Sequence, residues 1–421
     1  MRLLAAALLA AAVGLLALAG AAAVSWRPVV FLGAGLVVFL AVLAAGVVLA
    51  TRRRPAEGRR RARLVAFGAW ALAGIAVFVA TVLVPVGDPR RPPAPVAGQR
   101  FWDLPTGSRI AYVERPAGGR PRPTPVVFVH GGPGIADMAG DTAYFGRLAG
   151  DGYDVWVYDQ VGTGRSSRLA DPRRYDIARE VADLEAIRQR IGANRLVLIG
   201  HSWGGQVAAA YLAVHPGHVA KVVFSSPGAL APAVDDGSGG RVRARLTRGQ
   251  QLRLYRLLAW PRVLLAWTLL QLDPRAAHAF AGDAEMDARN DRVYNAGRAG
   301  AHCRDADPGP ALHGLGFYAY QFPQSAAARP WADPRPALAR QHIPALVIKG
   351  SCDYLSWSSG TAYLRAVPGS RLVYLHHAGH NSYQDQPAAF LATVRAFLAG
   401  RPLPEPARTG TAVPADYEGP P

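Results

Sequence analysis

The clearest chemical signal in this sequence is a serine placed between glycines. Gly200-His201-Ser202-Trp203-Gly204 matches the pattern G-x-S-x-G. A short apolar run at 196–200 precedes the serine and reads as a buried parallel strand, and a helix-forming run at 206–214 follows it. In that context the pattern predicts a nucleophile elbow, a strained turn that presents the serine oxygen above a sheet. The start of the following helix favours negative charge that develops there.

A serine hydroxyl is a weak nucleophile near neutral pH, so it needs a base, and the base needs an acid that orients it. Asp353 and His380 each follow a later apolar run that reads as a strand, 345–349 and 371–375. The order Ser202, Asp353, His380 is the order that accompanies this type of elbow. We therefore predict that these three residues form a catalytic triad.

Two neighbouring histidines, His376 and His377, are alternative bases. We favour His380 because it follows both a strand and a glycine and precedes the last predicted helix. The alternative for Asp353 is a solvated residue of a turn, but its place after a strand favours the triad.

A negative oxygen on the reacting substrate needs backbone N–H donors. Trp203, directly after the serine, is expected to supply one, and Gly132 in His130-Gly131-Gly132-Pro133-Gly134 the other, because paired glycines let the backbone approach the substrate. A phosphate-binding role for this loop is disfavoured, since no P-loop lysine and no dinucleotide fingerprint is present. We predict no cofactor and no metal, and we expect His130 to support the loop.

These groups must be positioned by a larger architecture. Short apolar strands alternate with helical segments in 99–229 and again in 336–400, which predicts a mostly parallel sheet with helices on both faces. Between them, 230–335 is rich in Leu, Trp, Pro and Gly without a clear strand, and we interpret it as a helical lid over the carboxyl ends of the strands. The Pro-rich residues 401–421 are predicted to be a disordered tail.

The first 87 residues predict a membrane anchor. Three uncharged apolar runs, Leu3–Val24, Val29–Ala50 and Leu64–Val86, each approach or exceed the ~20 residues that cross a bilayer. The first is also compatible with a cleaved signal peptide. The loop 51–63 carries seven Arg and one Glu, which predicts a cytoplasmic loop and a catalytic part on the extracytoplasmic side of the cell membrane. A Pro-rich linker, 88–98, follows.

The formal net charge is +18, but its distribution argues against nucleic acid as a partner. Residues 1–98 contain eleven Arg against Glu57 and Asp88, so half of the excess flanks the apolar runs. The expected partners are the lipid bilayer and a small peptide or acyl substrate.

The only two cysteines are Cys303, in the predicted lid, and Cys352, beside Asp353. The extracytoplasmic location permits a disulfide between them. The alternative is two buried free thiols.

The motifs VFVHGGPG, YDQVGTGRS and VADLEAIRQRIGANRLVLIGHSWGG, with the later GSCD and AGH, resemble the prolyl aminopeptidase (proline iminopeptidase) family of α/β-hydrolase-fold serine hydrolases. The resemblance covers roughly 99–400 apart from the lid. It implies the α/β-hydrolase fold, and a serine exopeptidase that releases an N-terminal residue, typically proline, with Ser202, Asp353 and His380 as its triad. The sequence departs from that family at Val161, where Arg is frequent, and at His201, where Gly is frequent. The Trp-Glu pair that usually recognises the substrate amine in the lid was not found.

An aminopeptidase needs a carboxylate for the substrate's ammonium group. In the lid segment GDAEMDARND, the aspartates at 283, 287 and 291 share a helical face that we expect to be solvated, which leaves Glu285 as the candidate. In contrast, 252–272 contains nine Leu and no acid. That stretch fits plain lid core, but also an acyl pocket or a membrane contact, which suits an esterase or amidase. A catalytically silent membrane receptor is a third interpretation, disfavoured by the complete set of Ser, Asp and His.

Overall fold

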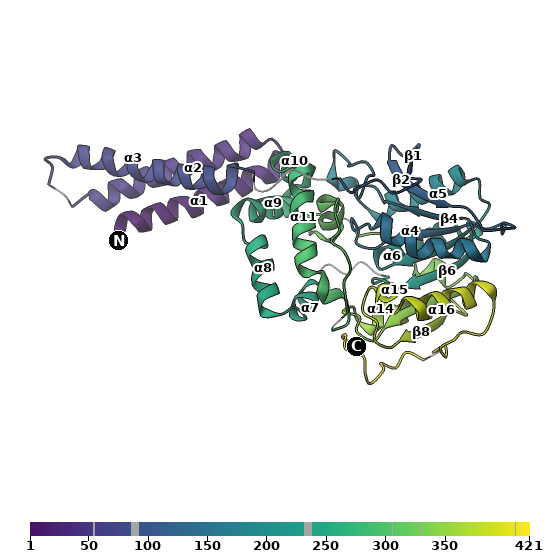
Figure 1. Cartoon of the computed structure of the whole chain (residues 1–421). Coiled ribbons are helices and arrows are strands. Elements are labelled where there is room, and N and C mark those ends of the chain that lie inside the picture. The colour runs from purple at the N-terminus through teal and green to yellow at the C-terminus, as the bar shows by residue number, and fades with distance from the viewer. Residues whose placement is uncertain (54, 86–91, 231–237, 305, 329, 409) are drawn as a thin grey trace.

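The computed structural model describes residues 1–421 except 54, 86–91, 231–237, 305, 329 and 409. It has an elongated helical bundle at one end and an α/β part at the other (Figure 1). The bundle consists of α1 (Arg2–Val24), α2 (Pro28–Thr51) and α3 (Arg59–Phe78), with η1 (Val79–Leu83) extending α3. These three helices are long and apolar enough to cross a membrane. The third begins earlier than predicted, and its predicted end at Val86 lies outside the described residues, as do 88–91 of the linker.

Small residues let the bundle helices approach each other closely. A Cβ added at Gly35 in α2 would lie 2.9 Å from Leu18 Cβ in α1, and one at Gly46 would lie 2.6 Å from Ala6 Cβ. Such small-residue contacts are typical of helix pairs that associate in lipid. The arginine-rich loop between α2 and α3 lies at the end of the bundle farthest from the α/β part (Figure 1).

The α/β part is built on one sheet, in which the described residues form eight strands in the order β1-β2-β4-β3-β5-β6-β7-β8. The first two pair antiparallel with their neighbours and the others run parallel. Their bounds are Arg100–Asp103, Arg109–Arg115, Val126–Val129, Val155–Tyr158, Leu196–His201, Val219–Ser225, Ala345–Gly350 and Arg371–Leu375. This confirms the predicted α/β-hydrolase architecture of a mostly parallel sheet.

Helices cover both faces because side chains of each buried strand alternate between them. In β3, Val127 and Val129 pack on one side, with α5 (Ile177–Ile191), α6 (Trp203–Val214) and α14 (Trp357–Ala366). Val126 and Phe128 pack on the other, with α4 (Met138–Phe145) and α16 (Pro387–Ala399). Shorter elements are η2 (Gly146–Asp151), η3 (Pro172–Arg174), η4 (Pro216–His218) and α15 (Ser382–Asp385).

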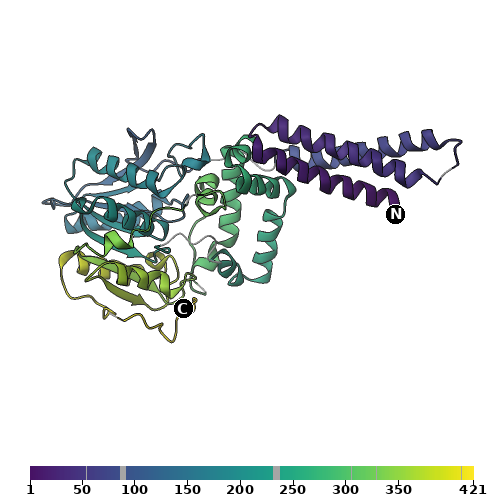
Figure 2. The same cartoon turned by 180° about the vertical axis from the view of Figure 1, so that it is seen from behind.

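The segment between β6 and β7 forms the helical lid. Its described elements are α7 (Ser238–Ala244), α8 (Arg248–Leu258), α9 (Pro261–Leu272), α10 (Pro274–Phe280), α11 (Asp283–Gly297), η5 (Arg298–Ala301), α12 (Phe317–Gln321), η6 (Phe322–Gln324) and α13 (Arg335–Leu338). Residues 231–237 of the predicted lid lie outside the described part. Helices α8 to α11 stand between the sheet and the bundle, as Figures 1 and 2 show from opposite sides.

The tail differs from the prediction of disorder. Arg408 pairs with Leu372 of β8, and the N–H of Trp357 donates to the carbonyl of Pro420 at 2.7 Å. Tyr417 is buried against Trp357, with ring centroids 5.3 Å apart. The Pro-rich composition gave no sign of this aromatic contact. The packing of Tyr417, together with the backbone hydrogen bonds, holds the described tail residues on the core.

Candidate active site

Ser202 sits at the strained turn that the G-x-S-x-G pattern predicts, between β5 and α6. Its backbone has φ 52° and ψ −113°, and a positive φ is costly for a residue with a side chain. The turn is tight enough that a Cβ at Gly200 would lie 2.3 Å from the carbonyl oxygen of Gly204. A Cβ at Gly204 would lie 1.9 Å from the carbonyl oxygen of Val129. Only glycine fits at these two positions, and the serine side chain is left at the apex.

His380 and Asp353 form a buried pair beside the serine. His380 Nδ1 lies 2.9 Å from Asp353 Oδ1. The other ring nitrogen of His380, Nε2, takes no part in this contact. Asp353 also accepts a hydrogen bond from the N–H of Leu355 at 3.0 Å. Ser202 and His380 line the same cavity. The structure therefore brings the three predicted triad residues to one place.

Lys349, which was not predicted from the sequence, lies in β7 and is completely buried. Its Nζ donates to Asp353 Oδ2 at 2.7 Å and to Ser359 Oγ at 3.2 Å. Burial lowers the pKa of Lys349, although the charge of Asp353 partly opposes this. Burial would raise the pKa of Asp353, but the charges of Lys349 and His380 and their hydrogen bonds outweigh it and hold that pKa below its usual range. A lysine inside an otherwise apolar strand, four residues before the acid, was the available signal.

The glycine loop after β3 packs directly on the elbow. A Cβ at Gly131 would lie 3.1 Å from Ser202 Cβ, and Gly132 has φ 120°. Within the described part of the chain, no hydrogen bond of the N–H of Gly132 or of Trp203 to a chain acceptor is observed. The oxyanion hole formed by these two N–H groups therefore stays a prediction.

His130 supports this loop, as expected. Its Nδ1 lies 2.8 Å from the carbonyl of Gly131, and its Nε2 accepts from the N–H of Gln160 at 2.9 Å. Burial lowers the pKa of His130 to about 4. A neutral imidazole that donates from Nδ1 and accepts at Nε2 satisfies both contacts.

A second chain of polar contacts, which was not predicted from the sequence, runs along the wall of the cavity, where it includes His201, His302 and Asn381. Asp385 Oδ1 lies 2.6 Å from His302 Nδ1, and the amide of Asn381 bridges His302 Nε2 at 3.2 Å and His201 Nε2 at 3.1 Å. The other oxygen of Asp385 accepts from the N–H groups of Gly379, at 2.7 Å, and Cys303, at 3.1 Å. Burial, followed by the charge of His380, lowers the pKa of His201 to about 3. Asp385 thus joins the lid to the loop that carries His380.

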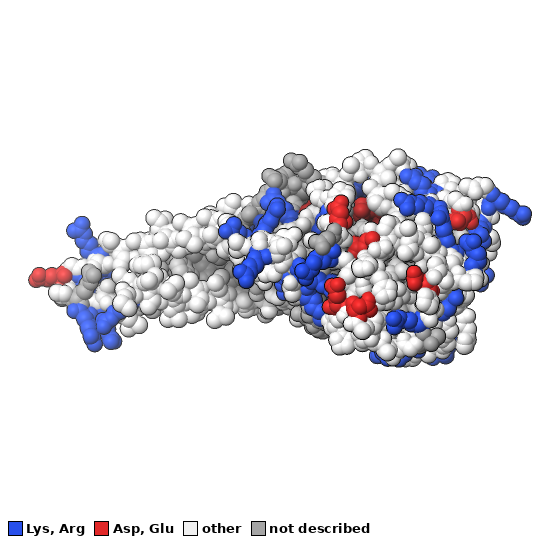
Figure 3. Space-filling view, turned by 60° about the horizontal axis from the view of Figure 1, so that its bottom comes forward, with Lys and Arg blue, Asp and Glu red and all other residues white. Residues whose placement is uncertain are grey.

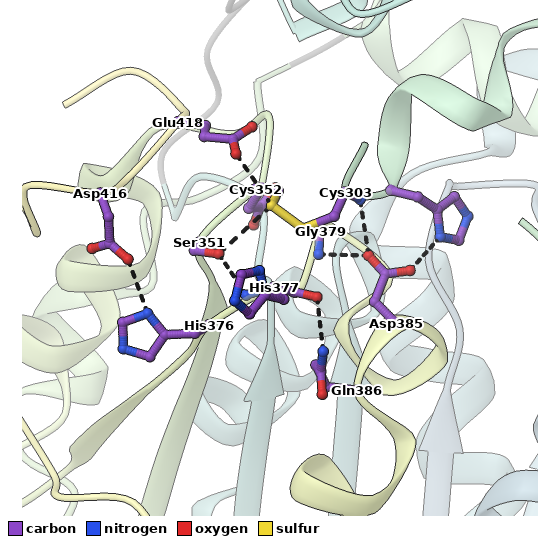
Figure 4. Close-up of a disulfide and its surroundings, with 12 residues drawn as sticks. Cys303, Ser351, Cys352, His376, His377, Gly379, Asp385, Gln386, Asp416 and Glu418 are labelled. Carbon is purple, nitrogen blue, oxygen red and sulfur yellow. Dashed lines mark hydrogen bonds and ion pairs between the residues drawn. A yellow bond between two sulfur atoms is a disulfide. The ribbon is translucent and has the colours of Figure 1, made fainter. Parts of the chain in front are cut away.

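A disulfide connects the lid to the loop that carries Asp353 (Figure 4). Cys303 follows η5 of the lid and Cys352 follows β7, and their Cα atoms are 5.2 Å apart. Next to the disulfide, the N–H of His380 donates to the carbonyl of Ala301 at 2.8 Å. The lid is therefore fixed to the triad loops both covalently and by hydrogen bonds.

The alternative bases point elsewhere. His376 is exposed, and its Nδ1 lies 2.9 Å from Asp416 Oδ2 of the tail (Figure 4). Neither His376 nor His377 lines the cavity that contains Ser202.

That cavity has a volume of about 660 Å³. Its floor is the elbow, the glycine loop and His380, and its opposite wall is contributed by the lid. The apolar lid residues in this wall include Val242, Leu254, Leu258, Val293 and Leu312.

Glu285 is not part of the cavity, so the structure corrects its expected role in binding an amine. Its carboxylate accepts from Arg262 Nε at 2.6 Å and from Nη2 at 2.8 Å, on the side of the lid that meets the bundle. The carboxyl groups that do line the cavity include Asp137 and Asp141. Asp141 accepts from the hydroxyl of Tyr383 at 3.0 Å, and burial raises its pKa well above the usual range.

The chain is similar in sequence and in fold to known proteins. The chain is 39% identical over 136 residues to a proline iminopeptidase of Heyndrickxia coagulans, a match that covers 31% of this chain and 44% of that protein. It is 28% identical over 307 residues to a (lyso)-N-acylphosphatidylethanolamine lipase of Mus musculus, covering 70% of this chain and 84% of the lipase. The crystal structure of VinJ superposes on 74% of this chain and on 99% of its own, with a TM-score of 0.50 and 21% identity.

The resemblance to proline iminopeptidases is thereby confirmed for part of the chain, although the match spans less than half of that first relative. The model of one family, described as the alpha/beta hydrolase fold, matches residues 124–387, which contain the elbow, the lid and both partners of Ser202. The chain belongs to the alpha/beta hydrolase fold family.

Proposed function

We propose that this protein is a membrane-anchored serine hydrolase with Ser202 as nucleophile, His380 as base and Asp353 as the group that orients His380. The observation that carries the proposal is that Ser202, at its strained apex, shares a cavity with the histidine whose Nδ1 is held by Asp353. The proposal extends to an extracytoplasmic catalytic part, because the arginine-rich loop 52–63 favours the cytoplasmic side.

The reaction follows from these positions. Ser202 Oγ attacks the carbonyl carbon of the substrate while its proton passes to His380 Nε2, and the carbonyl oxygen takes the negative charge opposite the N–H groups of Trp203 and Gly132. His380 then returns the proton to the leaving alcohol or amine, and the acyl group stays on Ser202. Water then attacks the acyl carbon and gives a proton to His380 Nε2. His380 passes this proton to Ser202 Oγ as the bond between Ser202 and the acyl group breaks, which releases the acid and regenerates the serine.

The substrate class that this cavity supports best is an ester or amide with an apolar acyl part. The lid supplies aliphatic side chains to the wall opposite Ser202, and Glu285 is occupied by Arg262 outside the cavity. The similarity to the lipase also extends over 70% of the chain, whereas the similarity to the first peptidase covers 31%.

Release of an N-terminal residue is the second candidate, favoured by the position of Asp137. This aspartate lines the cavity five residues after Gly132 and caps α4 by accepting from the N–H of Gly140 at 2.9 Å. Its carboxylate can therefore face a substrate ammonium group. Asp137→Asn should then raise KM for aminoacyl substrates and leave KM for simple acyl esters unchanged.

The test uses the full-length protein in membranes with a fluorophosphonate probe, which labels an activated serine. Wild type should be labelled and should hydrolyse members of a panel of acyl esters and aminoacyl anilides, while Ser202→Ala should do neither. Ser358→Ala, at an exposed position, is the matched control and should behave as wild type. Labelling or turnover by Ser202→Ala at the wild-type level would disprove the assignment.

A further inference from the structure

The lid is packed against the end of the helical bundle, not merely near it. Arg262, in α9, donates from Nη1 to the carbonyl of Val82 in η1 at 2.8 Å and from Nη2 to the carbonyl of Phe280 at 2.9 Å. Phe280, at the end of α10, meets Phe31 of α2 edge to face with ring centroids 6.5 Å apart. The ion pair with Glu285 is therefore structural: it fixes the guanidinium that binds the end of the third predicted span.

The depth of this contact matters. Helix α9 contacts α1 and η1, and its Ala266, Leu269 and Leu270 share one buried cluster with Leu18 and Ala22 of α1. Leu18 lies six residues before the end of α1, which is about 9 Å along a helix. If α1 crosses a bilayer, one side of α9 is therefore packed at the level of the last turns of the span, where headgroups meet acyl chains.

The opposite side of α9 is exposed and carries no charge. Leu264, Trp267 and Leu272 have exposed fractions of 50%, 49% and 43%, and recur at helical spacing. The other exposed residues of this helix are Pro261 and Thr268, whose hydroxyl donates to the carbonyl of Leu264 at 2.8 Å. A face of this kind is unfavourable in water and is suited to a membrane boundary, where tryptophan is enriched.

Helix α8 continues this surface with a different composition. It exposes Leu252 and Tyr255 beside the exposed arginines at 248, 253 and 256. Arginine next to apolar side chains fits the phosphate groups of anionic lipids. Figure 3 shows Lys and Arg side chains gathered where the bundle meets the globular part. On its other side α8 contributes Leu254 and Leu258 to the wall of the Ser202 cavity.

We propose that the exposed faces of α8 and α9 form a membrane-contact surface, seated at the headgroup–acyl boundary of the bilayer that holds the anchor, and that the substrate is an acyl lipid taken from that boundary. The surface is continuous with the anchor, because α9 is held to Val82 and Phe31 sits against Phe280, so lipid is the material that adjoins it. The inference rests on the proposed membrane anchoring and deepens the proposed hydrolase function, since one helix both lies on the lipid and lines the catalytic cavity.

Location is tested with the full-length protein reconstituted in vesicles of phosphatidylcholine and phosphatidylglycerol. Leu264→Cys and Trp267→Cys are labelled with an environment-sensitive fluorophore, and Val214→Cys, exposed at the end of α6, is the matched control. Labels at 264 and 267 should emit at shorter wavelength than the label at 214 and be quenched by lipids brominated on the acyl chain. Emission and quenching equal to those at 214 would overturn the proposal. The proposal would also be overturned if the label at 267 were protected from solvent in native membranes but not quenched in vesicles that contain no other protein. That result indicates a protein partner.

Function is tested with Leu264→Asp combined with Trp267→Asp, and separately with Arg253→Glu combined with Arg256→Glu. Hydrolysis of a vesicle-borne acyl lipid should fall at least about tenfold, because charge of the wrong kind is brought to the bilayer surface. Turnover of a short soluble ester should stay within about twofold of wild type, which shows an intact site. Equal losses on both substrates, or no loss on either, would contradict the inference.

Alkaline extraction of the vesicles separates this inference from the anchoring itself. Protein that is extracted contradicts the anchor. Protein that stays in the pellet with an unquenched label at 267 contradicts only the membrane-contact surface.

Discussion

Lys349 Nζ lies 2.7 Å from Asp353 Oδ2, on the oxygen opposite to the one that meets His380 Nδ1. The carboxylate is therefore shared between a buried ammonium group and the imidazole. This arrangement keeps Asp353 ionised in an interior where an isolated carboxylate would take up a proton. Lys349 acts on the site by positioning and charging Asp353, not by contact with substrate.

Lys349→Met should destabilise the protein by about 3–5 kcal/mol, because it leaves a buried charge without its partner. The pKa of Asp353 should rise, and so the acid limb of the pH–rate profile should move to higher pH. The depressed pKa of Asp353 contributes stability above its ordinary value near 3.9, which is lost as pH falls toward the folded value. Melting temperature and the pH dependence of kcat/KM measure the two effects. An unchanged acid limb would argue that Lys349 only fills space.

The choice of base is tested by two alanine variants. His380→Ala should lower kcat by at least about a thousandfold, as loss of a triad base does elsewhere. His377→Ala should have little effect, because that side chain is outside the cavity. The reverse pattern in steady-state kinetics would move the base to His377.

Two buried imidazoles make stability fall in mild acid. The pKa of His201 is lowered to about 3 and that of His130 to about 4, so both stay neutral in the folded protein while the unfolded chain binds protons below about pH 6.5. As the pH falls from 6.5 to the folded pKa of each histidine, that histidine should lower the free energy of unfolding by up to about 1.4 kcal/mol per pH unit.

The variant His201→Gln should lose the contribution of one titrating imidazole to the dependence of stability on pH. The melting temperature of the detergent-solubilised protein between pH 7 and pH 5 measures it, and an identical slope in wild type and variant would be inconsistent with a neutral His201.

The disulfide should support activity as well as stability. It closes a separation of 49 residues, for which the chain-entropy model gives about 4 kcal/mol. Reduction, or Cys303→Ser with Cys352→Ser, should lower the melting temperature and the rate together, because Asp385 and Ala301 hold the His380 loop beside it. Thiol titration of the denatured, unreduced protein should find none. Two reactive thiols per chain would rule the bond out.

Topology follows from the arginine-rich loop. Protease added to intact spheroplasts should digest the hydrolase part and leave the loop 52–63 protected. Cleavage of the hydrolase part only after lysis would reverse the proposed orientation.

The positions of Ser202, Asp353 and His380 were predictable because these residues follow strands, and parallel strands end at one edge of a sheet. The spacing of Gly200 and Gly204 also predicts the turn, where only glycine fits at these two positions. Lys349 was not predicted, because the sequence of a strand does not say which residue a buried lysine contacts until the position of the strand in the sheet is known. The pairing of His302 with Asp385 spans 83 residues and left no local pattern.

Glu285 was assigned wrongly for a related reason. Its partner Arg262 lies 23 residues earlier, on a different helix, and the pair faces the bundle. The tail was misjudged because its composition outweighed the single aromatic residue Tyr417, which packs on Trp357.

The contact between α9 and the bundle has a consequence for the evolution of this protein. Phe31, Leu18 and Val82 of the helical bundle share a buried cluster with Phe280 and Leu269 of the lid. A gene fusion that replaced this bundle with an unrelated span, or a chain begun at residue 99, would leave the lid's apolar side uncovered. The bundle and the lid are therefore expected to be inherited together and to vary together.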